Sequence, residues 1–90
     1  MMRNRLRPTQ EGTVEEQFLA LWQWGSVKDY RLCFETLAAP LEEMPEALLE
    51  GHFVNGLKVD IRAKMRVLRL IGLEEMMDLA QRIEERNLVV

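Results

Sequence analysis

The sequence predicts an all-α domain, a compact bundle of about five short helices, as three observations indicate. Apolar residues recur at spacings of three and four, the spacing that gathers side chains on one face of an α-helix. Glycine and proline separate these stretches from one another. No run between the turn signals alternates apolar and polar residues as a half-buried strand would.

Length and charge set the outer limits. A chain of 90 residues forms one domain whose small core is marginal, so oligomerisation is a plausible supplement. The net charge is −3, but Arg3, Arg5 and Arg7 make the first ten residues basic. The acidic remainder argues against a nucleic-acid module. A single cysteine fits a reducing, cytoplasmic location, and neither a membrane span nor a signal peptide is evident.

Residues 1–12 form an arm or linker, because Pro8 and Gly12 interrupt any helix, and residues 13–90 form the helical domain. Thr13 is a suitable N-cap for a first helix that carries Phe18 at core spacing and stops near Gly25. Three arginines of the arm are candidate RNA contacts, although such a segment is more often a solvated tail.

The second helix is the central core element. Ser26 can cap it, and Asp29 completes a shortened capping box. Its apolar face is formed by Val27, Tyr30, Phe34, Leu37 and Ala38.

The remaining helices follow the same spacing. A third helix begins at Pro45 and ends at Asn55-Gly56, with Leu48, Leu49, His52 and Phe53 on one face. A fourth, from Lys58 to Leu70, turns Ile61, Met65 and Leu68 inward and Arg62, Arg66 and Arg69 outward. Gly72 separates it from a last helix, Leu73 to about Asn87, beyond which Leu88 to Val90 are too few to form an element. The predicted core comprises Phe18, Val27, Tyr30, Phe34, Leu37, Phe53, Ile61, Met65, Met76, Ala80 and Ile83.

A search for catalytic chemistry finds no motif. His52 is the only histidine and Cys33 the only cysteine, and each is more often a core residue than a member of a catalytic pair. Neighbouring carboxylates such as Glu42 and Glu43 diverge instead of converging. We expect no enzymatic activity, no metal and no cofactor.

The segment from Gln23 to Ala39 also carries a family resemblance. Gln23, Gly25, Asp29, Tyr30, Phe34 and Leu37 resemble the major homology region of retroviral capsid C-terminal domains. The segment GSVKDYRLCFETLA is similar to the Gag of plant gypsy-type LTR retrotransposons, and the resemblance extends from about Leu6 to Asn87.

This resemblance implies a structural domain of a retrotransposon capsid, which self-associates, usually as a homodimer, to assemble virus-like particles around element RNA. An upstream capsid domain of the polyprotein is the other implied partner, and any RNA contact is weak or indirect. The resemblance places the dimer contact on the third helix, near Ala47 and Leu48, although Ala47 is smaller than the usual aromatic anchor. Cys33 stands where these regions tend to carry arginine.

The two tryptophans suggest a different interface. Trp22 and Trp24 are two positions apart, about 200° around a helix, so one core-facing stripe cannot bury both. Tryptophan is enriched at interface hot spots. We therefore expect at least one of them in a symmetric dimer contact with Leu19 and the third helix. The alternative is that Trp24 folds back and closes the bundle within one chain.

Two further functions stay open. One is a SCAN-like or domesticated Gag-derived dimerisation module in a regulatory host protein. The other is RNA binding through the outward face of the fourth helix, against which the alternative is a solvated face balanced by the acidic last helix.

Overall fold

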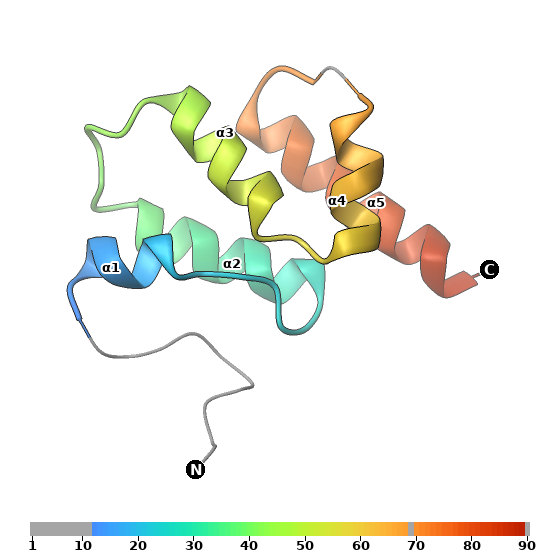
Figure 1. The fold of residues 1–90 in the computed structure, drawn as a ribbon, viewed down its shortest axis with the longest axis horizontal. Coiled ribbons are helices and arrows are strands. Elements are labelled where there is room, and N and C mark those ends of the chain that lie inside the picture. The colour runs from blue at the N-terminus through green and yellow to red at the C-terminus, as the bar shows by residue number, and fades with distance from the viewer. Residues whose placement is uncertain (1–11, 69, 90) are drawn as a thin grey trace, which may run out of the picture.

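The computed structural model describes residues 12–68 and 70–89, apart from the side chain of Val89. This part of the chain forms five α-helices, drawn in Figure 1: α1 (Val14–Leu19), α2 (Val27–Ala38), α3 (Glu46–Asn55), α4 (Val59–Arg66) and α5 (Leu73–Val89). No strand occurs among these residues. The all-α prediction with five helices is confirmed.

Helix α1 begins where the sequence predicts and ends early. Thr13 and Glu16 form a reciprocal capping box at its start. The helix stops at Leu19, so the prediction that it continues to near Gly25 is wrong. Leu21 and Gln23 are buried while Trp22, between them, is 48% exposed. This alternation belongs to extended backbone, and it brings Leu21 and Gln23 inward in a way that a continued helix would not.

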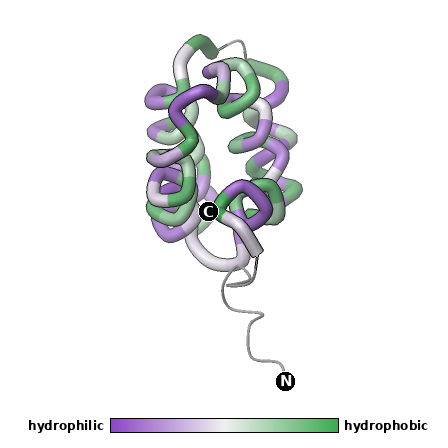
Figure 2. Tube along the Cα trace, turned by 90° about the vertical axis from the view of Figure 1, so that its left-hand side faces the viewer, coloured by the Kyte–Doolittle hydropathy of each residue, from purple (hydrophilic) through white to green (hydrophobic). Residues whose placement is uncertain are grey.

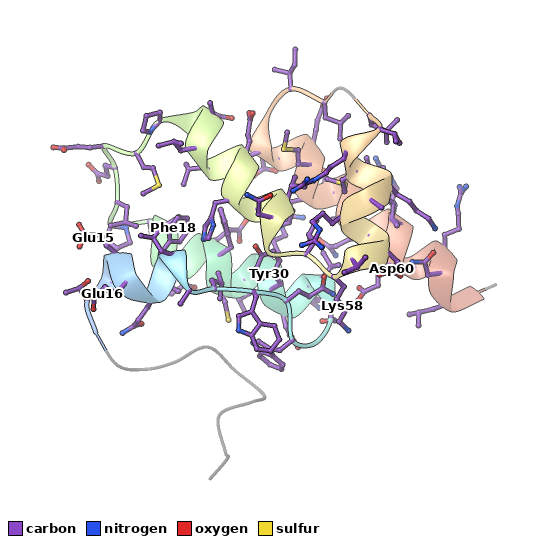
Figure 3. The ribbon with its side chains drawn as sticks, viewed as in Figure 1. Glu15, Glu16, Phe18, Tyr30, Lys58 and Asp60 are labelled. Carbon is purple, nitrogen blue, oxygen red and sulfur yellow. The ribbon has the colours of Figure 1, made fainter. Side chains whose placement is uncertain are left out.

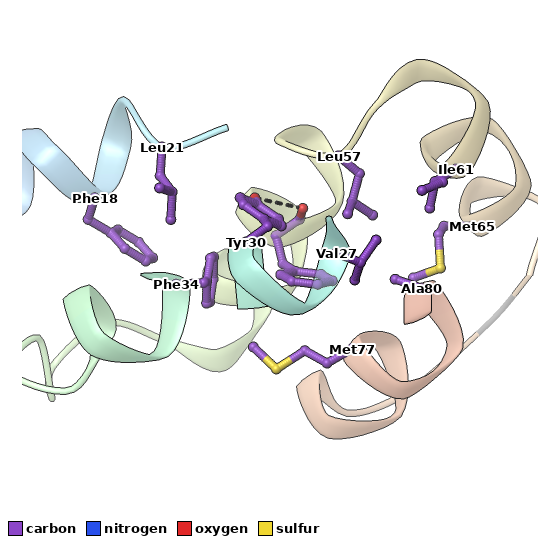
Figure 4. Packing of buried hydrophobic residues seen from close by; sticks show 11 residues of the cluster. Phe18, Leu21, Val27, Tyr30, Phe34, Leu57, Ile61, Met65, Met77 and Ala80 are labelled. Atoms are coloured by element: carbon purple, nitrogen blue, oxygen red, sulfur yellow. Dashed lines mark hydrogen bonds between the residues drawn. The ribbon is translucent and has the colours of Figure 1, made fainter. Parts of the chain in front are cut away.

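Helix α2 is the central element, packing against both α1 and α5. Ser26 accepts a hydrogen bond from the backbone N–H of Asp29 and so caps the helix as predicted. Hydrophobic and hydrophilic residues alternate around the helices in the pattern of amphipathic elements (Figure 2). The apolar face of α2 meets the other helices in the core shown in Figure 4.

The core draws residues from all five helices. The buried apolar side chains are Phe18, Leu21, Val27, Tyr30, Phe34, Phe53, Leu57, Ile61, Met65, Met77 and Ala80. Three residues of the predicted core, Leu37, Met76 and Ile83, are partly buried and pack against this cluster. Phe34 has ring contacts with both Phe18 and Phe53, at centroid distances of 4.9 and 5.3 Å, so it connects α1, α2 and α3.

The last two helices differ from the prediction at their ends. Helix α4 stops at Arg66, four residues before the predicted end, and Leu68 is 48% exposed where an inward position was expected. Gly72 has a φ of +107°, which only glycine adopts readily, so the chain turns there before α5. Helix α5 continues to Val89 and includes Leu88, beyond the predicted limit at Asn87.

Candidate functional site

The extended segment between α1 and α2 is fixed by a buried glutamine. Gln23 is 3% exposed, and its backbone N–H donates to the carbonyl of Gly56 at 2.7 Å. Its side-chain amide donates to the carbonyl of Gly25 at 2.9 Å and accepts from the backbone N–H of Lys58 at 3.0 Å. A buried amide is costly unless it is hydrogen-bonded. Gln23 therefore locks this segment onto the connection between α3 and α4.

Tyr30 reaches the same connection from α2. Its hydroxyl donates to the backbone carbonyl of Phe53 at 2.9 Å, the bond drawn dashed in Figure 4. The last carbonyls of a helix have no partner within the helix, so this hydroxyl caps α3 from outside. Burial raises the pKa of the Tyr30 hydroxyl, which keeps the donor protonated.

Gly56 leaves room for that hydroxyl. A Cβ at Gly56 would overlap the Tyr30 hydroxyl and would lie 2.9 Å from Tyr30 Cζ and 3.1 Å from the carbonyl oxygen of Leu21. The φ of Gly56 is −86°, an ordinary helical value. The sequence places a helix stop correctly at Asn55-Gly56, but the close approach of Tyr30 is what requires glycine there.

Helix α5 contacts α2 at two places, the first residue of α2 and a residue further along the same helix. Both carboxylate oxygens of Glu84 accept from the backbone N–H of Val27, at 3.1 Å, so a side chain of α5 caps the start of α2. Arg31 of α2 forms ion pairs with Glu35, Glu74 and Asp78. Burial lowers the pKa of the Arg31 guanidinium, but hydrogen bonds to Asp78 and Glu35 outweigh that effect and raise it.

Sequence reasoning missed the roles of Glu84 and Arg31. Cys33, which replaces the arginine typical of the homology region, is half-buried against the core. The long-range polar contacts of α2 instead involve Arg31, the Tyr30 hydroxyl and the backbone N–H of Val27. The one signal for Gln23 was its place in the homology-region resemblance, whereas nothing in the local sequence indicates a partner as distant as Glu84.

The candidate interface residues are exposed to different degrees. Leu19 is 65% exposed, Trp22 48% and Leu48 60%; Ala47 is also exposed and Trp24 is half-buried. The two tryptophans do not sit 200° apart on a helix, because they belong to the extended segment. Trp22 is exposed between the buried Leu21 and Gln23, whereas Trp24 lies in the bend that precedes α2 and is half-buried.

Of the six residues considered for RNA contact, only Arg62 and Arg66 belong to the described part of the chain. Arg3, Arg5, Arg7 and Arg69 lie outside it. Arg62 donates to the carbonyl of Asn55 at 3.2 Å, and Arg66 donates to the side chain of the same asparagine. Both arginines therefore occupy the C-terminal end of α3, where positive charge suits the helix dipole. The acidic residues of α5 that form ion pairs contact Arg31, not α4.

His52 is half-buried, and its ring packs against the aromatic rings of the core. Its ring lies 4.6 Å from that of Phe18, and Nε2 is 2.5 Å from the Phe18 carbonyl oxygen. Among the described residues no group of histidine, cysteine and carboxylate side chains could hold a metal ion. None of the helices in this part of the chain is long and apolar enough to span a membrane.

The all-α bundle together with a family-model match identifies this part of the chain as a Gag-like capsid domain. The chain belongs to the PEG10/RTL1 family, C-terminal capsid-like domain, whose family model matches residues 14–87. This match supports the resemblance to a capsid C-terminal domain but does not specify a plant gypsy-type element. The family is structural in kind, not catalytic. No curated protein and no solved structure matches the chain.

Proposed function

We propose that this domain is the self-association module of a Gag-like capsid protein, which forms a homodimer as the unit of particle assembly. The observation that carries the proposal is the pair of large apolar side chains, Leu19 and Trp22, exposed at the end of α1 in a member of a capsid-like family. Exposed aromatic surface of this kind favours a protein contact. Ala47 and Leu48 at the start of α3 are the second candidate contact.

The rigidity of the segment that carries Trp22 supports this choice. Its neighbours Leu21 and Gln23 are buried, and the Gln23 hydrogen bonds hold the backbone in one conformation. An anchor that is already ordered in the free chain loses little conformational entropy on binding. Trp24, two residues further along and half-buried, is the next candidate for this contact.

A second candidate is a SCAN-like or domesticated dimerisation module in a regulatory host protein. The family match is compatible with this candidate, because the match does not require the domain to belong to an active retrotransposon. The two functions predict different assemblies, a discrete dimer for the regulatory module and growth into particles for the capsid module once the upstream capsid domain is present. In both, RNA contact is weak or indirect, and neither requires catalysis.

The test is light scattering across a concentration series of the parent, Trp22→Ala, Trp24→Ala and Ala47→Glu. Truncating an anchor tryptophan costs about 2 kcal/mol or more, roughly a thirtyfold rise in the dimer Kd. Val59→Ala serves as the control, since Val59 is 68% exposed on α4, outside both candidate contacts.

The variants separate the two candidate contacts. A monomeric Ala47→Glu beside dimeric Trp22→Ala and Trp24→Ala would assign the dimer to α3. Circular dichroism establishes that each variant is folded. A parent that stays monomeric at every concentration would refute the proposal.

A further inference from the structure

Two surface hollows of the molecule carry opposite charge. The first, about 540 Å³, lies between the start of α1 and the connection from α2 to α3, and we call it the acidic pocket. The second, about 440 Å³, lies between the end of α4 and α5, and we call it the basic groove. The acidic pocket is lined by Glu15, Glu42 and Glu43 with Leu41, Met44 and Leu48. The basic groove is lined by Lys64, Arg82 and Arg86 with Val67, Leu68 and Ile83.

The charges of both hollows have no ion-pair partner among the residues that the structure describes. All ion pairs among the described residues involve Arg31, so none of the six charged groups named above is neutralised by one. Lys64 donates to the Asn87 side chain at 2.9 Å, a neutral partner. Arg82 and Arg86 stand four apart on α5, where like charges destabilise a helix. Each hollow would therefore be stabilised by a ligand of the opposite charge.

Each hollow also exposes apolar surface next to its charges. Val67 is 79% and Leu68 48% exposed beside the basic groove, and Leu48 is 60% exposed beside the acidic pocket. A partner surface that matches either hollow needs exposed apolar side chains beside charges of the opposite sign. The other hollow of the same chain has this composition.

The geometry prevents the two hollows of one chain from meeting. The acidic pocket lies at the end where Glu15 is labelled in Figure 3, and α4, with Lys58 and Asp60 at its start, lies at the opposite end. Two acidic pockets, or two basic grooves, would repel each other in a symmetric pair. Opposite charges instead favour a contact between the unlike ends of two molecules.

We propose that the basic groove of one chain binds the acidic pocket of a second copy, in a head-to-tail contact that uses neither Leu19 nor Trp22 and so differs from the symmetric contact through those residues. The inference rests on the proposed self-association and adds a second interface to it. A heterologous contact of this kind closes into rings or extends into filaments, whereas a symmetric contact ends at two copies. Together the two contacts would allow growth in more than one direction.

A second copy explains more of the surface than RNA would. RNA would match the cations of the basic groove but would leave its apolar lining and the whole acidic pocket without a role. One contact with another copy uses both hollows at once.

The test uses charge reversal on each side. One variant carries Glu42→Lys and Glu43→Lys, a second carries Arg82→Glu and Arg86→Glu, and both are made in a background of Leu19→Ala with Trp22→Ala to remove the symmetric contact through those residues. Weight-average mass is measured by light scattering at low and at high salt, with circular dichroism to verify folding. Glu75→Lys, an exposed acidic position of α5 outside both hollows, is the control.

We expect the background variant to associate head to tail at low salt, more weakly as salt screens the contact. Each reversal alone should lower the association constant at least about tenfold, because like charges then face each other. An equimolar mixture of the two reversal variants should recover association, since every contact in it again joins opposite charges. A chain carrying all four reversals should recover it as well.

The outcomes distinguish this inference from the proposed function. A parent dimer that is lost with Trp22→Ala or Ala47→Glu but is unaffected by charge reversal would overturn only the head-to-tail contact. A background variant that is monomeric at low salt, or a mixture that associates no better than its components, would overturn it too. Loss of RNA binding on reversal of the basic groove, with unchanged mass, would assign the groove to RNA and overturn the inference. A parent that is monomeric throughout overturns both.

Discussion

One hydroxyl group and one missing methyl group determine how α2 meets the end of α3. The Tyr30 hydroxyl donates to the Phe53 carbonyl, and Gly56 is the residue whose Cβ would occupy the place of that hydroxyl. The two residues are thus a matched pair, 26 positions apart in the chain. Tyr30 belongs to the homology-region resemblance. Gly56 is required by the close approach of the Tyr30 hydroxyl, which the sequence around the turn does not indicate.

Tyr30→Phe and Gly56→Ala should each destabilise the fold by about 1–3 kcal/mol, through an unsatisfied carbonyl in one case and overlap in the other. Because Tyr30→Phe removes the atom nearest to the new methyl group, the double variant should lose less stability than the sum. Denaturant unfolding measures the three free energies. Gly51→Ala is the control: a Cβ there meets nothing within 4 Å, so alanine should stabilise α3 by about 0.5–1 kcal/mol. Additive losses at positions 30 and 56 would refute the pairing.

Among the elements, helix ends are completed by side chains of other helices. Glu84 of α5 caps the first amide of α2. Side chains of α3 cap the start of α5 in the same way: Glu50 accepts from the N–H of Gly72 at 3.1 Å, and Glu46 accepts from the N–H of Leu73 at 3.2 Å. Short helices have marginal stability by themselves, so these contacts couple helix formation to tertiary packing.

Glu84→Ala should destabilise the domain by about 0.5–2 kcal/mol, because α2 loses an acceptor and a favourable charge at its positive end. Glu84→Gln keeps an acceptor and should cost less, so the difference between the two variants isolates the charge. Thermal unfolding of both, beside Glu85→Ala as an exposed neighbour in the same helix, makes the comparison. Equal effects of Glu84→Ala and Glu85→Ala would contradict the capping role.

The helices could be predicted from the sequence because the signals that specify them are local. The spacing of Val27, Tyr30 and Phe34 identifies the buried face of α2, and the caps at Thr13 and Ser26 identify two helix starts. The end of α1 could not be predicted, because the amide of Gln23 bonds to Gly56, a partner brought near only by the fold. The capping role of Glu84 depends in the same way on a distant contact.

For the molecule as a whole, Phe34 is the side chain on which most of the packing converges. It is fully buried, and its ring lies within 5.8 Å of His52 as well as near Phe18, Tyr30 and Phe53. Removing a phenylalanine of this kind leaves a cavity bordered by three helices.

Phe34→Ala should therefore cost about 3–5 kcal/mol, a large part of the 5–15 kcal/mol that a typical domain has. For a domain of this size the melting temperature should fall by about 12 °C or more. Leu32→Ala is the matched control, since Leu32 is 63% exposed on the same helix and its loss should change stability little. Calorimetry of both variants is decisive. If Phe34→Ala melts like the parent, α2 is not the centre of the core.

The cap that Glu84 provides has a consequence for synthesis on the ribosome. The amide of Val27 is translated 57 residues before its acceptor. At translation rates of about 5–20 residues per second, α2 remains without this cap for about 3–11 seconds. During that interval the face of α2 that meets Met77 and Ala80 has no covering helix, so the nascent domain exposes apolar surface until α5 emerges. The domain therefore cannot complete its folding until α5 has been translated.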